Sequence, residues 1–317
     1  MLISEQIASH IAIFKSAVSD SLSSSYKRTW NRCLRNGGPP QEPDYVADLS
    51  LDWVSDFAKL LQIILHTKFS IGITGVFCHQ KPLADYGSSP SPEIGDLLIV
   101  LEYREQGLKP LFNSLLLQAK SSTSSSFTIG SGDLHQLKLY EEWPKFRYKR
   151  AAMMNGQTRD IHPKCPNSGG KFLLVDPSYI HWADLPGHFP YGCAVPNRSI
   201  VLSREFADEL IQFLTFNSGK AISDRNSITE DWSRMIWDLL DITKGKVAKR
   251  SRSGLAKGFD RQTAAATDGF YRFEGESGNG YFGSLQGGRS NDGNDYSSDD
   301  GGGVSTIYVE ISEREIE

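Results

Sequence analysis

Three polar residues that could share a metal ion lie at the ends of two apolar runs. Asp96 precedes the run Leu97–Tyr103, and Gln118 and Lys120 end the next run. Apolar runs of this length between turn residues are typical of buried strands, and the short link predicts an antiparallel hairpin. A hairpin folded about residues 107–108 would put Asp96 close to opposite Lys120, with Gln118 on the diagonal. Polar groups gathered at one end of an apolar hairpin are costly in a core, so they indicate a functional site.

A carboxylate, an amide and an ammonium group would meet here, and the resemblance described below implies that together they hydrolyse a phosphodiester bond. The reaction needs a hard divalent cation such as Mg²⁺ or Mn²⁺, which takes oxygen ligands. Asp96 would supply a carboxylate, and Gln118 and the backbone carbonyl of Ala119 would supply further oxygens. The cation would lower the pKa of a bound water, and Lys120 would orient that water or help to deprotonate it.

A second pair of candidates follows on a predicted helix. Gln136 and Tyr140 are four residues apart on one helix face, and both could hydrogen-bond a phosphate or a metal-bound water. Simpler interpretations stay open. Asp133 and Gln136 have the spacing of a capping box, and Tyr140 could be a core aromatic residue. Lys120 could be a surface residue that ends an edge strand, and Asp96 could be a turn residue.

In their order and spacing, these residues resemble the motifs of the PD-(D/E)XK nuclease superfamily. Asp96 matches the acid that begins one strand, and Gln118-Ala119-Lys120 matches the acid-x-Lys triplet on the paired strand. The helix carries Gln136 and Tyr140 in the Gln-x-x-x-Tyr pattern of the RecB-like branch. The resemblance covers roughly residues 50–150.

The resemblance implies an α/β protein with a restriction-endonuclease-like mixed central sheet flanked by helices. It also implies a metal-dependent endo- or exonuclease that uses Mg²⁺ or Mn²⁺, with DNA expected as substrate before RNA. By analogy with the family, such a protein would be an effector of bacterial antiphage defence. A protein partner could supply recognition or activation, and a homo-oligomer stays open.

One position departs from the family pattern. Gln118 stands where the superfamily usually has Asp or Glu, and a neutral amide adds no charge to hold a cation. A compensating acid could be Glu93, or Asp52 or Asp56 on the preceding predicted helix. The two aspartates could equally belong to a solvated acidic face near a helix N-terminus. The alternative function is a catalytically degenerate nucleic-acid-binding or assembly subunit.

Composition limits the class of protein. The 317 residues are 39% hydrophobic and 23% charged, which predicts a globular body, and the net charge of -4 excludes a generally basic nucleic-acid coat. Four Cys without CxxC spacing predict free thiols in a reducing compartment. No apolar run reaches the roughly 18 residues of a membrane span, and no signal peptide is recognisable, so we expect a cytoplasmic protein without membrane contact.

The chain divides into five predicted parts. They are an N-terminal helix and loop (1–48), the nuclease-like core (49–150), an α/β extension (151–245), a basic and then Gly/Ser/Asp-rich flexible segment (246–303) and a C-terminal strand (304–317). The predicted helices are 3–20, 49–67, 133–148 with a kink or an end at Pro144, 203–216 and 229–243. The predicted strands are 71–80, 97–103, 111–117, 171–176, 200–202 and the C-terminal one. Residues 21–50 are predicted to be a loop, and the C-terminal strand is expected to dock on a sheet edge of this chain or of a partner.

Two further groups of residues could bind ligands. The most positive stretch could hold a phosphate backbone without sequence preference, through Lys246, Lys249, Arg250 and Arg252. A smaller basic cluster near the N-terminus would be either a solvated face or a nucleic-acid contact: Lys27, Arg28, Arg32 and Arg35. Five scattered His and Cys residues are interpreted as ordinary loop residues, with a zinc site as the less favoured alternative: His162, Cys165, His181, His188 and Cys193.

Overall fold

The computed structural model describes residues 2–35, 37–78, 81–183, 185, 187–252, 269–274, 281–282 and 302–314. Its strands are β1 (Phe69–Phe77), β2 (Leu83–Asp85), β3 (Leu97–Arg104), β4 (Leu111–Ser121), β5 (Ser126–Thr128), β6 (Phe146–Lys149), β7 (Thr158–Arg159), β8 (Gly170–Val175), β9 (Tyr191–Ala194), β10 (Ser199–Val201), β11 (Arg204–Glu205), β12 (Lys220–Ile222), β13 (Gly269–Glu274) and β14 (Ser305–Glu313). Its α-helices are α1 (Leu2–Ala8), α2 (Ile11–Arg35), α3 (Glu42–Asp48), α4 (Val54–Leu65), α5 (Leu134–Glu142), α6 (Phe206–Leu214) and α7 (Asp231–Arg252). Short helical turns are η1 (Leu49–Trp53), η2 (Ser131–Asp133), η3 (Ala152–Met154), η4 (Tyr179–His181) and η5 (Arg225–Ser227).

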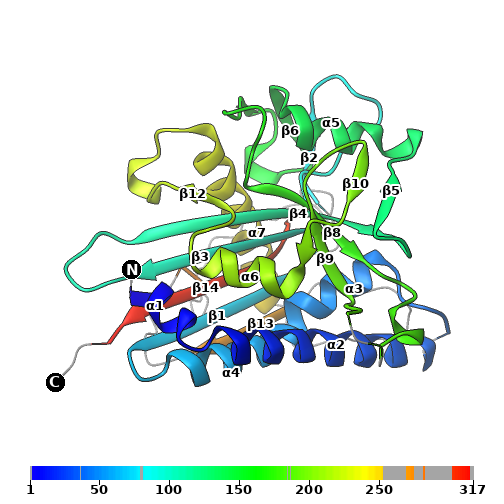
Figure 1. Cartoon of the computed structure of the whole chain (residues 1–317). Helices are drawn as coiled ribbons and strands as arrows, with labels where there is room; N and C mark the ends of the chain where they lie inside the picture. Colours follow the sequence, from blue (N-terminus) through cyan, green and yellow to red (C-terminus); the bar gives the residue numbers. More distant parts are fainter. Residues whose placement is uncertain are drawn as a thin grey trace.

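The fold is mixed α/β, with a mixed central sheet flanked by helices (Figure 1). The strand order is β11-β9-β8-β4-β3-β14-β1-β13, and β12 pairs with the outer part of β4. β3 and β4 are antiparallel, whereas β4 and β8 are parallel and are joined through α5. Two small sheets, β5-β10 and β2-β6-β7, stand beside the central one. The predicted hairpin and the strands at 71–80 and 171–176 are confirmed.

Both faces of the central sheet are buried, which explains the continuous apolar runs of its strands. Along β3, Leu97 and Ile99 belong to the core formed with α1, α2, α4 and α6. The alternate residues Leu98 and Val100 face the opposite core, which includes residues of α5 and α7. In Figure 1, α2 and α4 lie below the sheet and α5 lies above it.

The N-terminal region is more helical than predicted. Residues 21–50 were expected to be a loop because they are rich in Ser, Gly and Pro, but α2 continues through Arg35 and α3 follows. The buried face of α2 continues at helical spacing through Leu22, Tyr26 and Cys33. Tertiary burial of this stripe outweighs the weak helix propensity of serine.

The C-terminal strand lies inside the sheet and not at an edge. β14 runs parallel to β3 on one side and antiparallel to β1 on the other, so the expected docking on a sheet edge was wrong. Ile307, Val309 and Ile311 are buried in the core. β13, from the segment predicted to be flexible, pairs with the far side of β1. The remainder of 264–303 lies outside the described residues, apart from 281–282 and 302–303.

Several element boundaries also differ from prediction. α5 ends at Glu142, one residue before a left-handed Trp143 (φ 42°), because Pro144 cannot continue a helix. The chain then forms β6, so the helix ends before Pro144, which is one of the two predicted alternatives, and does not continue through a kink. β9 lies within a stretch predicted to be irregular, and α6 is preceded by Glu205 and not by the predicted cap Ser203. Within the described residues, no helix is long and apolar enough to cross a membrane.

Candidate active site

The β3–β4 hairpin brings two of the predicted residues face to face. Leu97 pairs with Leu117, so the next position sets Asp96 opposite Gln118, and the expected pairing of Asp96 with Lys120 is wrong by two residues. The turn is centred on Gly107, whose positive φ of 72° suits a glycine. Since side chains alternate along a strand, Lys120 extends from the same sheet face as Gln118, at the diagonal position.

Asp96 is the centre of the site. Its carboxylate is buried, with the residue 5% exposed. Oδ2 accepts hydrogen bonds from Gln118 Nε2 and from the backbone N–H of Ala119 (2.7 Å), and Oδ1 accepts one from Lys81 Nζ. Ala119 therefore meets Asp96 through its N–H, while the metal role of its carbonyl stays a prediction. A buried carboxylate with three donors is held in one orientation.

Lys81, which sequence reasoning missed, adds a second ammonium group. It lies in the β1–β2 connection and is 9% exposed. Its Nζ donates a hydrogen bond to the Asp96 carboxylate and lies 3.3 Å from Glu93 Oε2. Burial lowers the pKa of Lys81, but the carboxylates of Asp96 and Glu93 outweigh that effect and raise it. Burial raises the pKa of Glu93, and the Asp96 charge adds to this, while Lys81 opposes it. No local sequence signal distinguishes a buried loop lysine from an exposed one.

Lys120 is also largely buried and pairs with an acid at the start of α5. Its Nζ is 3.1 Å from Asp133 Oδ1, and its side chain is 12% exposed. Asp133 makes no side-chain cap to the helix, so the capping-box interpretation of Asp133 and Gln136 is wrong. A lysine held this way can donate to an anionic oxygen at the edge of the sheet.

Glu42, at the start of α3, reaches the same edge from the opposite face. Its Oε1 accepts the N–H of Ser121 (2.5 Å). Burial raises the pKa of Glu42, and the negative charge of Asp96 adds to this increase. The hydrogen bond from the Ser121 N–H and the positive charge of Lys120 oppose the increase. The sequence analysis did not single out Glu42, because nothing local links α3 to the end of β4.

Tyr140 extends from α5 to the hairpin, and Gln136 lies one turn earlier on the same helix. Tyr140 is buried, and its hydroxyl donates to the carbonyl of Ile94 (2.9 Å). A Cβ at Gly95 would lie 3.0 Å from that hydroxyl, so glycine permits the contact. Burial raises the pKa of Tyr140 well above its usual value, and the charge of Asp96 adds to this, so the phenol stays neutral. Tyr140 thus anchors the segment that carries Asp96.

Two amide oxygens among the candidate residues have no hydrogen-bond partner. Gln118 Oε1 and Gln136 Oε1 are both buried and unsatisfied. Unpaired buried acceptors are costly, and amide and carboxylate oxygens are the ligands that hard divalent cations take. The donor set around Asp96 and Glu93 therefore fits Mg²⁺ or Mn²⁺ in kind. However, no group of three or more His, Cys, Asp or Glu side chains that could hold a metal exists among the described residues.

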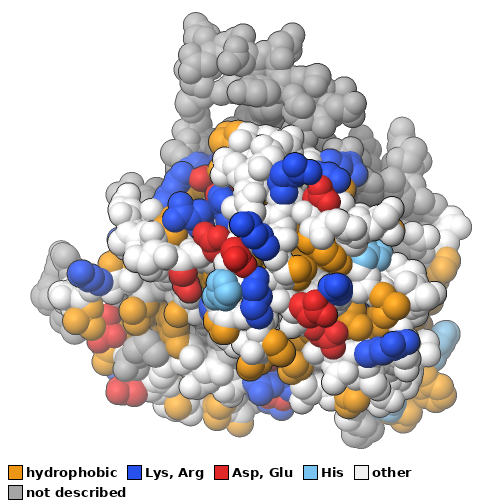
Figure 2. All heavy atoms as spheres, turned by 90° about the horizontal axis from the view of Figure 1, so that it is seen from above, with side chains coloured by type: hydrophobic (Ala, Val, Ile, Leu, Met, Phe, Trp, Pro, Cys, Tyr) orange, Lys and Arg blue, Asp and Glu red, His pale blue; other side chains and the backbone are white. Residues whose placement is uncertain are grey.

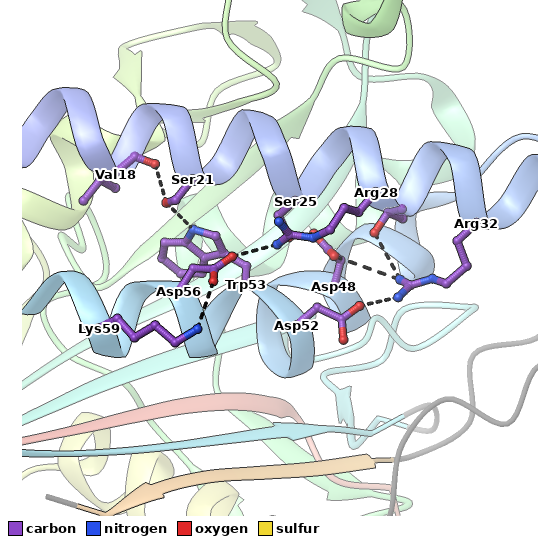
Figure 3. Close-up of polar contacts among 11 residues, drawn as sticks. Val18, Ser21, Ser25, Arg28, Arg32, Asp48, Asp52, Trp53, Asp56 and Lys59 are labelled. Atoms are coloured by element: carbon purple, nitrogen blue, oxygen red, sulfur yellow. Dashed lines mark hydrogen bonds and ion pairs between the residues drawn. The ribbon is translucent and has the colours of Figure 1, made fainter.

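The two other candidate acids do not reach this site. Figure 3 shows Asp52 and Asp56 directed toward Arg32 and Arg28 of α2. Asp52 accepts from Arg32 Nη1, and Asp56 Oδ2 is 2.8 Å from Arg28 Nη2. Of the three acids considered, only Glu93 lies beside Asp96. These ion pairs also place two members of the N-terminal basic cluster in a helix–helix interface.

The scattered His and Cys residues do not form a zinc site in the described structure. His162 is 3.5 Å from Asp160, the His188 ring stacks on Trp182, and Cys193 is buried in the core. Within the described residues, none of the four cysteines forms a disulfide bond, as predicted.

The outer surface above α5 carries charges of both signs. Figure 2 shows Lys and Arg side chains interleaved with Asp and Glu on this face. Arg147 and Lys149, for example, are each 3.0 Å from Asp85. The basic stretch predicted to bind phosphate lies in the last turns of α7, which extends through Arg252. Its side chains lie outside the described residues: Lys246, Lys249, Arg250 and Arg252.

Comparisons of the chain with protein-family models, with curated proteins and with solved structures found no match.

Proposed function

We propose that this protein is a metal-dependent nuclease that hydrolyses phosphodiester bonds, with DNA favoured over RNA. The observation that carries the proposal is the gathering of Asp96, Gln118 and Lys120 at one end of a buried hairpin, beneath the helix of Gln136 and Tyr140. The mixed sheet, with this hairpin followed by a helix and a parallel strand, supports the restriction-endonuclease-like fold that we propose with it.

The residues suit this chemistry in distinct roles. A bound Mg²⁺ or Mn²⁺ would lower the pKa of water and offset negative charge on the phosphate. Asp96, Glu93 and the unpaired oxygens of Gln118 and Gln136 would hold it. Lys120 would donate to a phosphate oxygen or orient the attacking water. Tyr140 positions the backbone before Asp96. By analogy with the family, we propose a cytoplasmic role in bacterial antiphage defence, with a protein partner that supplies recognition.

A second candidate function is a nucleic-acid-binding or assembly subunit without activity. Lys81 favours it, because this ammonium already neutralises Asp96, and Gln118 adds no charge. In this alternative, the C-terminal strand offers no free edge for recruiting a partner, because β14 is enclosed between β1 and β3.

Plasmid and single-stranded DNA cleavage with Mg²⁺ or Mn²⁺ separates the two candidates. For the nuclease, Asp96→Asn and Lys120→Ala should each reduce cleavage by at least about a hundredfold while DNA binding persists. Asp56→Asn, at a distant ion pair, is the control and should cleave like the wild type. Binding without cleavage under either metal would favour the second candidate.

A further inference from the structure

A pocket opens beside the candidate active site, at the C-terminal ends of β4 and β8. Its volume is about 440 Å³, within the size range of small-ligand pockets. It is lined by the serine-rich loop after β4, the end of β8, the chain from η4 into β9, and Leu202 between β10 and β11. The lining residues used below are Ser122, Ser124, Asp176, Trp182, Phe189 and Leu202.

The pocket and the site share one edge of the sheet. Ser122, which lines the pocket, follows Lys120 by two residues, about 7 Å of extended chain. Its N–H donates to the carbonyl of Val175 (2.9 Å), which fixes the loop to the end of β8. A strand whose phosphate lay at Lys120 would therefore have an adjacent base within reach of this pocket.

One wall of the pocket offers an aromatic surface. Trp182 is 48% exposed and stacks on the His188 ring, with centroids 6.5 Å apart. Phe189 and Leu202 extend this apolar wall. Gly192 allows Leu202 to lie against β9, since a Cβ there would be 2.1 Å from Leu202 Cδ1. A large exposed indole at a pocket mouth is a stacking platform for a flat ligand.

The pocket lining also includes polar residues. Asp176 Oδ1 accepts from the N–H and the hydroxyl of Ser178, at 2.8 and 2.6 Å. Within the described part of the chain, no donor reaches Asp176 Oδ2. Ser122 and Ser124 also line the pocket, and the Ser122 hydroxyl donates to the carbonyl of Ser124 (2.9 Å). A carboxylate oxygen in this lining can accept from an exocyclic amino group, as acids do from cytosine N4.

We propose that this pocket binds one nucleobase of a single strand whose backbone lies at the Asp96–Lys120 site. The base stacks on Trp182 and presents its polar edge to Asp176, so bases with an exocyclic amino group are preferred over thymine. This inference rests on the proposed function, because it takes the strand held there as the ligand.

The test uses the full chain and a single-stranded DNA of about ten nucleotides carrying one 2-aminopurine. Ca²⁺ replaces Mg²⁺ to prevent turnover. The wild type should bind it and quench its fluorescence. Trp182→Ala should weaken binding about tenfold and abolish the quench, while Trp182→Phe keeps most of the affinity. Leu108→Ala, 63% exposed at the far end of the hairpin, is the control and should match the wild type.

A second arm compares oligo-dC with oligo-dT, where Asp176→Asn should reduce the preference for dC. Equal affinity and quenching in the wild type and Trp182→Ala would overturn the pocket proposal, as would absence of binding by the wild type. The cleavage experiment with Asp96→Asn is independent of this result, so nuclease activity could stand while the base pocket fails. Circular dichroism and thermal unfolding of Trp182→Ala establish that the variant is folded.

Discussion

Lys81 and Asp96 form a buried ion pair at the end of the β3–β4 hairpin, where the resemblance implies a divalent cation. Lys81 Nζ also lies 3.3 Å from Glu93 Oε2. The ammonium therefore binds the two carboxylates that would hold a metal ion in the proposed enzyme. A bound cation and Lys81 would compete for the same carboxylate oxygens, and this competition can be tested.

Removing the ammonium should favour the metal. We expect Lys81→Met to bind Mn²⁺ at least about tenfold more tightly than the wild type in calorimetric titrations, because a competing positive charge is lost. Without metal, the variant should lose about 3 kcal/mol of unfolding free energy, since Asp96 loses a buried partner. Lys149→Met, in an exposed pair with Asp85, is the control and should change neither quantity by much. An unaltered Mn²⁺ affinity in Lys81→Met would refute the competition.

Placing the acid of the PD-(D/E)XK motif at position 118 should make the stability of the protein depend on metal. Gln118→Glu sets a second carboxylate against Asp96 and removes the Nε2 donor, so the metal-free protein should be destabilised by about 2 kcal/mol. Added Mn²⁺ should reverse this loss and raise the melting temperature above that of the metal-loaded wild type. Gln157→Glu on the exposed β6–β7 connection is the control. The same Mn²⁺ response in Gln118→Glu and the wild type would argue against a cation at this position.

Tyr140 should act through position rather than by contact with substrate. Tyr140→Phe deletes the hydrogen bond to the carbonyl of Ile94 and should cost about 1 kcal/mol of stability. If Asp96 shifts as a result, kcat should fall roughly tenfold with little change in KM. Tyr86→Phe also removes a hydroxyl that donates to a backbone carbonyl, that of His135 (2.7 Å), and serves as the matched control. A change in KM alone would indicate substrate contact instead.

Asp48 should make stability depend on pH. It is fully buried against Ser25, and burial raises its pKa from 3.8 to about 7. The unfolded chain loses this proton at lower pH than the folded one, so the stability contribution of Asp48 falls as pH rises from about 4 to about 7. Asp48→Asn avoids the buried charge and should therefore gain on the wild type between pH 5 and pH 8 in urea unfolding. The gain should be on the order of a few kcal/mol.

Asp56→Asn, whose carboxylate is partly exposed beside Arg28, is the control for that experiment (Figure 3). It should show the same difference from the wild type at both pH values. If Asp48→Asn is instead less stable than the wild type at pH 8, then Asp48 is ionised in the folded protein and pairs with Arg32.

The hairpin, the strand β8 and the helix bearing Gln136 and Tyr140 could be predicted because periodicity and turn residues are local signals. The same logic predicted that Asp96 and Gln118 share one end of the hairpin. The predicted register was wrong by two residues. The register depends on the exact centre of the turn, and that centre is Gly107 with its positive φ. The prediction of a loop over residues 21–50 was also wrong. Its many serines drew attention away from the apolar residues at helical spacing that α2 buries.

Tertiary structure alone decided what surrounds Asp96. Lys81 and Glu42 arrive from distant segments, and Asp133 pairs with Lys120 in preference to capping its own helix. The insertion of β14 between β1 and β3 likewise depends on long-range pairing, which no local pattern encodes. Residue types and spacing thus determined which groups could do chemistry, whereas packing over long sequence separations determined which charges they meet.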